Sequence, residues 1–200
     1  MKRNLGMTNF KNKIIFKLLL LVFLTAVLPA QAALLDLLQD GQHVLLMRHA
    51  DAPGYGDPAG YQLGQCPTQR NLGEAGKRQA KLIGDWLVQQ GVKEPKLFSS
   101  PWCRCLDTAS LMNLGSTTIE PILGSFFDDM SLEMQQTKQL AMFVKKALLE
   151  FPKKPIILVT HHVNIQGFTG KVVDVGDMVL VRVDMNGRYV SHTIYKSPRF

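Results

Sequence analysis

The chain has 200 residues and a formal net charge of +7, with 46% hydrophobic and 20% charged residues. This length supports one domain of ordinary size and excludes a large multidomain assembly. The composition excludes both a disordered tail and a multispan membrane protein. The positive charge would favour a polyanionic partner such as nucleic acid, so the distribution of that charge along the chain has to be considered first.

The first 32 residues have the layout of a secretory signal peptide. They carry five basic residues and no acidic residue, and the apolar run at residues 18–28 is too short to span a bilayer comfortably. Pro29 and the small residues Ala30 and Ala32 match a signal-peptidase site, so we predict cleavage after Ala32. An uncleaved membrane anchor is the alternative, which the helix-breaking Pro29 disfavours.

Cleavage would leave a mature chain of residues 33–200 in the periplasm or in the medium, with no stable membrane span. That chain has 18 basic and 16 acidic residues and a net charge of +2, so no general attraction to nucleic acid remains.

Apolar runs and helix signals alternate along the mature chain, and Asn186 and Gly187 form a strong hairpin turn signal near its end. The long segment at residues 50–72 is rich in Gly and Pro and is predicted to be a loop. The predicted strands are residues 42–47, 96–99, 117–123, 155–160, 178–184 and 188–195, and the predicted helices are residues 74–90, a helix opened by Pro101, and residues 132–151. This alternation predicts an α/β fold, with helices covering a mostly parallel central sheet.

Basic side chains follow three of the predicted strands. Arg48 and His49 follow the first strand, Ser99 and Ser100 lead from the second into Arg104, and His161 follows residues 155–160. Because ligands bind at the C-terminal ends of parallel strands, we expect these side chains to meet. Two guanidiniums and two imidazoles without a nearby acidic cluster predict a pocket for a compact dianion such as phosphate.

The residue types also predict a reaction. A neutral imidazole can attack phosphorus and form a phosphohistidine, which divides one difficult displacement into two easier ones. Neighbouring arginines keep that imidazole unprotonated and neutralise charge on the transferring group. Such a site requires no metal ion and no other cofactor.

The three cysteines, Cys66, Cys103 and Cys105, would lie in an oxidising compartment after export. Cys103 and Cys105 are too close in sequence to pair readily with each other, so we expect Cys66 to pair with one of them and leave one free thiol. A zinc site is the alternative, and the C-x-C spacing without a second cysteine pair disfavours it.

Four sequence blocks together resemble the histidine phosphatase superfamily, which is phosphoglycerate-mutase-like. The blocks are Leu-Met-Arg-His-Ala at 46–50, Leu-Gly-Glu-Ala-Gly at 72–76, Ser-Ser-Pro-Trp-Cys-Arg-Cys at 99–105 and Val-Thr-His at 159–161. The resemblance covers nearly all of residues 33–200 and implies one domain, a three-layer α/β/α sandwich. It implies His49 as the nucleophile, Arg48 and Arg104 as phosphate ligands, and His161 as the second histidine that stabilises the transferring phosphoryl group.

The proton donor departs from the family pattern. Many members carry a Glu near the stretch corresponding to residues 122–127, and this chain has none there. Asp128 and Asp129 follow closely, and we favour Asp128 as the donor. Further candidates are Asp51, Glu120 and Glu133. Two milder departures are Ala50, where glycine is common, and Gly73, which replaces a helix-capping Thr.

The residues around Cys66 to Leu72, Ser125 to Phe127 and Thr160 to Ile165 look similar to an exported branch that includes lipopolysaccharide core heptose phosphate phosphatases. This resemblance implies a phosphorylated sugar of the cell envelope as substrate and Arg70 as a third phosphate contact, although a surface arginine is an equal alternative for Arg70. His162 is expected in the pocket wall or bonded to backbone. A noncatalytic phospholigand-binding module and a phosphomutase of the same family are the alternative functions.

Overall fold

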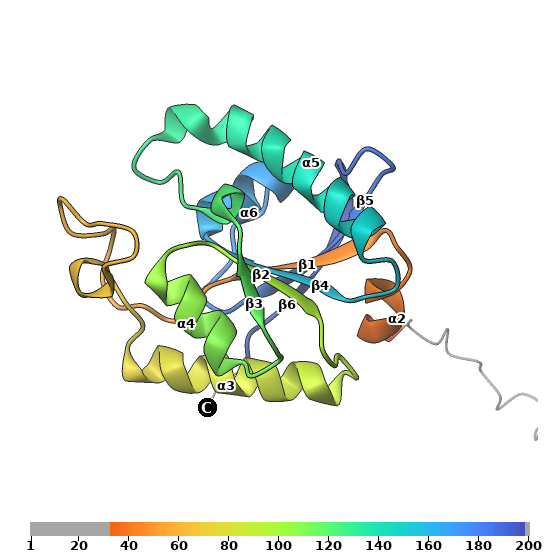
Figure 1. Cartoon of the computed structure of the whole chain (residues 1–200), viewed down its shortest axis with the longest axis horizontal. Coiled ribbons are helices and arrows are strands. Elements are labelled where there is room, and N and C mark those ends of the chain that lie inside the picture. Colours follow the sequence, from red (N-terminus) through yellow and green to blue (C-terminus); the bar gives the residue numbers. More distant parts are fainter. Residues whose placement is uncertain (1–32, 199–200) are drawn as a thin grey trace, which may run out of the picture. The chain divides into compact units, whose positions relative to one another are not determined.

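The computed structural model describes residues 33–198, so the predicted signal peptide and its cleavage site lie outside the described residues. Six strands form one sheet in the order β3-β2-β4-β1-β5-β6 (Figure 1). The strands are β1 (His43–Arg48), β2 (Lys96–Ser99), β3 (Thr117–Ile119), β4 (Ile156–Thr160), β5 (Met178–Val183) and β6 (Tyr189–Tyr195). The helices are α2 (Leu34–Leu38), α3 (Glu74–Gln89), α4 (Cys103–Leu111), α5 (Glu133–Glu150) and α6 (His162–Thr169).

The pairing of the strands confirms the mostly parallel α/β sheet. β1 pairs with β4, β4 with β2 and β2 with β3, all in parallel. β5 is antiparallel to β1, and the predicted hairpin joins it to β6. The C-terminal ends of β2, β4 and β1 therefore lie side by side at one edge of the sheet.

Helices cover both faces of the sheet, as Figure 1 shows, with α3 and α4 on one side and α5 and α6 on the other. Alternate residues of β1 explain the two layers. Leu45 and Met47 belong to a core shared with α2, α3 and α4, whereas Val44 and Leu46 belong to a second core with α5 and α6. All four side chains are fully buried, which confirms the three-layer α/β/α arrangement.

Two glycines let α3 approach its neighbours closely. A Cβ atom at Gly76 would lie 1.9 Å from the carbonyl oxygen of Asp51, in the segment that leaves β1. A Cβ atom at Gly84 would lie 2.1 Å from the carbonyl oxygen of Met112, just after α4. Helix α3 is thus in direct backbone contact with the segment that carries Arg48 and His49.

Several boundaries differ from the sequence prediction for local reasons. The strand predicted at 117–123 ends at Ile119, because Pro121 lacks the N–H group that a strand ladder needs and instead begins a 3₁₀ turn. The helix predicted after Pro101 begins at Cys103. Helix α6 was not predicted from the sequence; it starts directly after His161 and ends at Thr169, where Gly170 with a φ of 71° caps it. The five-residue α2 was also not predicted from the sequence.

No helix among residues 33–198 is long and apolar enough to cross a bilayer.

Candidate active site

The six side chains predicted for the site line one cavity of about 310 Å³ at the C-terminal edge of the sheet. They are Arg48, His49, Arg70, Arg104, Asp128 and His161. His49 follows β1 and His161 follows β4, and their backbones are joined by the bond from the His49 N–H group to the Thr160 carbonyl at 3.0 Å. The parallel register of β1 and β4 therefore places the two histidines next to each other.

His49 is held as a neutral base. Its side chain is buried, and Nδ1 lies 2.7 Å from the carbonyl oxygen of Ala50. A carbonyl can only accept a hydrogen bond, so Nδ1 carries the proton and Nε2 keeps its lone pair. Burial holds the pKa of His49 well below its usual value, and the positive charges of Arg104, Arg48 and Arg70 lower it further.

His161 lies beside His49, with ring centroids 5.5 Å apart in an edge-to-face arrangement. Arg104 Nη2 lies 3.4 Å from His161 Nδ1, and because a guanidinium only donates, Nδ1 is the acceptor. Nε2 then carries the proton and donates to Ser100 Oγ at 2.8 Å. Burial first, then His49 and Arg104, lower the pKa of His161 well below its usual value. Both ring nitrogens therefore have protein partners.

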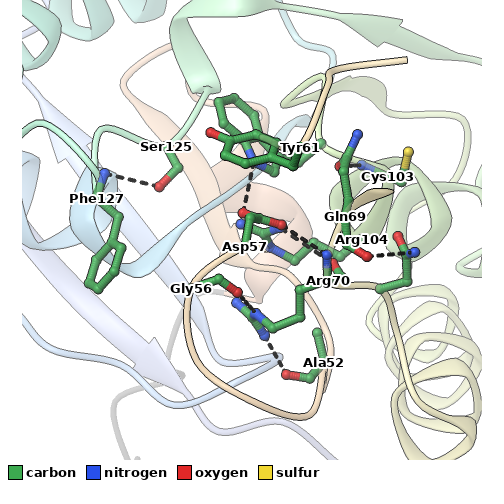
Figure 2. Close-up of polar contacts among 12 residues, drawn as sticks. Ala52, Gly56, Asp57, Tyr61, Gln69, Arg70, Cys103, Arg104, Ser125 and Phe127 are labelled. Atoms are coloured by element: carbon green, nitrogen blue, oxygen red, sulfur yellow. Dashed lines mark hydrogen bonds and ion pairs between the residues drawn. The ribbon is translucent and has the colours of Figure 1, made fainter. Parts of the chain in front are cut away.

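Arg104 forms a buried ion pair with Asp57, a residue that the sequence analysis missed. Its Nη1 lies 2.9 Å from Oδ1 and 3.1 Å from Oδ2 of Asp57, and both side chains are 4% exposed. Figure 2 shows the Asp57 carboxylate facing Arg104 from the loop at residues 50–72. The sequence does show an acidic residue in a Gly- and Pro-rich loop after an Arg-His pair. Its partner Arg104 lies 47 residues later, so only the folded structure reveals the ion pair.

Two guanidinium nitrogens in the site have no protein acceptor within the described chain. Arg48 is partly buried and donates from Nη1 to the carbonyl oxygen of Val173 at 2.9 Å, but its Nε is buried without a partner. Arg104 Nε is in the same situation. Burial lowers the pKa of Arg48, although Asp174 and Asp177 oppose that shift. Unpaired buried donors beside a cavity are favourable partners for an anion.

Arg70 lies at the cavity and also braces the loop from which it comes. Its Nε donates to the carbonyl oxygen of Gly56 at 2.9 Å, and its Nη1 donates to that of Ala52 (Figure 2). Burial and the neighbouring Arg104 lower its pKa. The structure thus gives Arg70 a structural role in the loop, alongside its place in the cavity wall.

Asp128 is an exposed carboxylate in the cavity wall, where its Oδ2 accepts a hydrogen bond from the hydroxyl of Tyr61 at 3.2 Å. Burial and the nearby Asp128 raise the pKa of Tyr61, so the phenol keeps its proton. Among the other candidate donors, Asp51 lines the cavity, whereas Asp129 and Glu120 cap 3₁₀ turns through backbone N–H groups.

Three ring side chains line part of the cavity wall. Exposed Tyr55 meets Phe127 edge to face, with ring centroids 5.1 Å apart, and Phe127 lies 5.7 Å from the ring of His162. All three residues line the cavity, so His162 occupies the expected position in the pocket wall.

The structure shows which cysteine pairs with Cys66. Cys66 and Cys103 form a disulfide with Cα atoms 5.6 Å apart, and Cys105 is free and buried. Burial raises the pKa of Cys105 to about 12, so its thiol stays protonated. Within residues 33–198, no group of three or more His, Cys, Asp or Glu side chains is placed to hold a metal ion.

The fold and this cavity define an α/β protein with a histidine- and arginine-lined cavity at the C-terminal ends of the parallel strands. The profile of the histidine phosphatase superfamily (branch 1) matches residues 44–133, which include His49 and Arg104 but not His161. Residues 44–133 are thus similar to the histidine phosphatase superfamily, and residues 33–198 share the fold of solved phosphatases.

Several solved structures share the fold. The protein histidine phosphatase SixA, complexed with tungstate, is 17% identical, with a TM-score of 0.53 over 77% of this chain and 94% of that chain. A mycobacterial glucosyl-3-phosphoglycerate phosphatase is 14% identical, with a TM-score of 0.52 and coverage of 76% and 96%. A phosphoserine phosphatase from Entamoeba histolytica, in complex with 3-phosphoglyceric acid, is 14% identical, with a TM-score of 0.57 and coverage of 78% and 97%. No curated protein sequence matches this chain significantly.

Proposed function

We propose that this protein hydrolyses phosphate monoesters through a phosphohistidine at His49, without a metal ion. The observation that carries this proposal is the state of His49: Nδ1 is fixed on the Ala50 carbonyl, which leaves the Nε2 lone pair beside three guanidiniums in one cavity. A neutral imidazole next to a concentrated positive charge is suited to attack a bound phosphate dianion.

The reaction takes two displacements. In the first, His49 Nε2 attacks phosphorus, the bond to the ester oxygen breaks, and Asp128 gives a proton to the departing oxygen. In the second, water attacks the phosphohistidine, its proton passes to the Asp128 carboxylate, and inorganic phosphate leaves while Nε2 regains its lone pair. Arg48 and Arg104 bind the phosphoryl oxygens in both steps.

His161 would stabilise the transferring phosphoryl group, which requires it to exchange one protein contact for a phosphoryl oxygen. The contact of 3.4 Å from Arg104 Nη2 is weaker than the bond to Ser100, which is 2.8 Å. Arg70 is proposed as a third phosphate contact, through the part of its guanidinium that does not brace the loop.

For the substrate we propose a small phosphate ester, specifically a phosphorylated sugar of the cell envelope such as a lipopolysaccharide sugar phosphate, met in the periplasm or outside the cell. The signal-like sequence of residues 1–32 and the resemblance to the exported branch support this location. Two of the similar structures are named for small phosphorylated compounds, glucosyl-3-phosphoglycerate and phosphoserine, which supports the size of the substrate.

The test is hydrolysis of an aryl phosphate by the mature protein, with and without a chelator, beside His49→Ala and the control His192→Ala on β6. We expect activity that the chelator does not change, that His49→Ala abolishes and that the control retains. An acid-labile phosphoenzyme should be trapped in the wild-type chain and be missing from His49→Ala.

Other results would replace the proposal. Phosphate binding without turnover of any phosphate ester would indicate a binding module, and net transfer of the phosphoryl group back to substrate would indicate a mutase. A phosphoenzyme that survives His49→Ala would place the nucleophile elsewhere.

A further inference from the structure

We propose that Asp57 is a positioning residue that holds Arg104, and through Arg104 the ring of His161, in the arrangement that binds the transferring phosphoryl group. This inference rests on the proposed function and extends it to a loop residue outside the strand-end motifs. Figure 2 shows the contact at its centre, with Asp57 reaching from the loop to Arg104.

The Asp57 carboxylate is surrounded by donors. Oδ1 accepts from Arg104 Nη1 and from the backbone N–H of Arg70, each at 2.9 Å. Oδ2 accepts from the same Nη1 at 3.1 Å and from the indole Nε1 of Trp102 at 3.2 Å. Every partner donates and none accepts, which matches an ionised carboxylate. Asp57 is therefore placed to orient its neighbours and not to give a proton to a leaving group.

The pair leaves the reactive side of Arg104 available. Asp57 occupies Nη1, whereas Nε has no acceptor and Nη2 reaches His161 Nδ1 at 3.4 Å. The edge formed by Nε and Nη2 is one of the two edges with which a guanidinium binds a phosphate through parallel hydrogen bonds. A guanidinium fixed at its third nitrogen presents that edge without having to be ordered on binding.

The contacts continue from Asp57 to the second histidine. Arg104 Nη2 determines which nitrogen of His161 accepts, and that choice directs the His161 Nε2 proton to Ser100 Oγ at 2.8 Å. Loss of the carboxylate would free Arg104 to rotate and would remove the contact that fixes the His161 tautomer.

Bonds within the surrounding loop fix the position of Asp57. Arg70 binds the carbonyl oxygens of Ala52 and Gly56, and Gly56 has a φ of 65°, which turns the backbone immediately before Asp57. The disulfide from Cys66 joins the far end of the same loop to Cys103, next to Arg104. The Arg70 bonds and the disulfide therefore fix both ends of the loop that carries Asp57.

A competing interpretation gives the opposite result. Asp57 carries a carboxylate that binds Arg104, the proposed phosphate ligand. In this interpretation the carboxylate occupies the position of the substrate phosphate and has to move away before the substrate binds. Its removal would then strengthen phosphate binding and leave kcat unchanged or higher. A positioning carboxylate predicts a lower kcat and a loss that is greater for a transition-state analogue than for phosphate.

The experiment compares Asp57→Asn with Asp85→Asn, which removes the same charge from an exposed position on α3. Binding of inorganic phosphate and of vanadate is measured by calorimetry, and turnover on an aryl phosphate is measured with it. We expect Asp57→Asn to weaken vanadate binding about tenfold, to change phosphate binding less than about threefold and to lower kcat about tenfold. Wild-type affinities with wild-type kcat would overturn the proposal, and so would tighter phosphate binding with unchanged kcat.

Two further measurements keep the test independent of folding and of the proposed activity. Asp57→Glu keeps the charge but shifts the carboxylate by one methylene, and it should also weaken vanadate more than phosphate if Asp57→Asn does not fold. Nitrogen NMR of the histidine rings reports the His161 tautomer with no substrate present. Unchanged His161 resonances in a folded Asp57 variant would overturn the positioning role even if the chain hydrolysed no phosphate ester.

Discussion

The strand-end side chains and the loop at residues 50–72 contribute to the same cavity by different physical means. His49 and His161 are buried and fixed by the backbone register of β1 and β4. The loop residues Asp57 and Arg70 are held by side-chain bonds to backbone and to Arg104. Backbone pairing between strands fixes the reactive groups at the ends of the strands. Individual side-chain hydrogen bonds and ion pairs fix the loop residues. We therefore expect the chemistry to depend most on the first region and stability to depend more on the second.

The largest effect should come from Arg104, where the two regions meet. Arg104→Ala removes the phosphate ligand, the contact to His161 Nδ1 and the partner of buried Asp57. We expect kcat/KM on an aryl phosphate to fall about a thousandfold, which corresponds to about 4 kcal/mol of transition-state stabilisation. Arg182→Ala, an exposed arginine on β5, is the matched control. A loss below tenfold would show that the strand-end site works without this guanidinium.

The disulfide should matter for stability more than for chemistry. Cys66→Ser opens a covalent ring of 37 residues in sequence separation and should lower the free energy of unfolding by about 3 kcal/mol, because the unfolded chain regains entropy. Denaturant unfolding measures this loss. Reductant should shift the wild-type transition and leave that of Cys66→Ser unchanged. A fall in kcat/KM as large as that of Arg104→Ala would contradict the division between the two regions.

Replacement of Asp128 should separate substrates by their leaving groups. Asp128→Asn should lower kcat/KM about a hundredfold for an alkyl phosphate and less than about threefold for an aryl phosphate, because a phenolate departs without a proton. Asp85→Asn should change neither. If Asp129→Asn produces this difference instead, the proton donor is the neighbouring residue, and equal losses on both substrates would remove Asp128 from the acid role.

The two buried histidines should make stability depend on pH. The pKa values of His49 and His161 lie well below their usual value of 6.5 in the folded protein. Above pH 6.5 both states are neutral, so the shift has no effect there. As pH falls below 6.5, the unfolded chain binds protons that the folded chain does not, and stability falls by up to about 1.4 kcal/mol per pH unit for each group.

Thermal unfolding between pH 7 and pH 5 measures that dependence. A His49→Ala, His161→Ala double variant should show a shallower slope over the same range than the wild-type chain. An equal slope would mean that other groups dominate the acid side of the stability profile.

The parts of the fold that follow from local pattern could be predicted from the sequence. The strand at 96–99 matches β2, and the helix at 74–90 matches α3 to within a residue, because apolar periodicity and end signals are local. The meeting of Arg48, His49, Arg104 and His161 followed from the rule that parallel strands end at one edge. Helix α6 was missed because it has eight residues, carries a weak amphipathic pattern and directly follows a strand.

The contribution of the loop could not be predicted in the same way. Nothing local to Asp57 indicates a partner in α4, and the choice between Cys103 and Cys105 depends on which thiol faces Cys66. Arg70 illustrates the same limit, because its bonds to Ala52 and Gly56 carbonyls depend on the path of the folded loop. Long-range partners of this kind are specified by tertiary packing and carry no sequence periodicity.

The ring closed by Cys66 and Cys103 can form only where the two thiols are oxidised. It encloses α3 and β2, contains Arg70, and ends one residue before Arg104. Because the bond forms by oxidation, a newly made chain in a reducing compartment would hold its loop through noncovalent bonds, among them those of Arg70 and Asp57. Oxidation of the two thiols would then complete the ring, so the covalent link would add stability to a loop whose other bonds are already made.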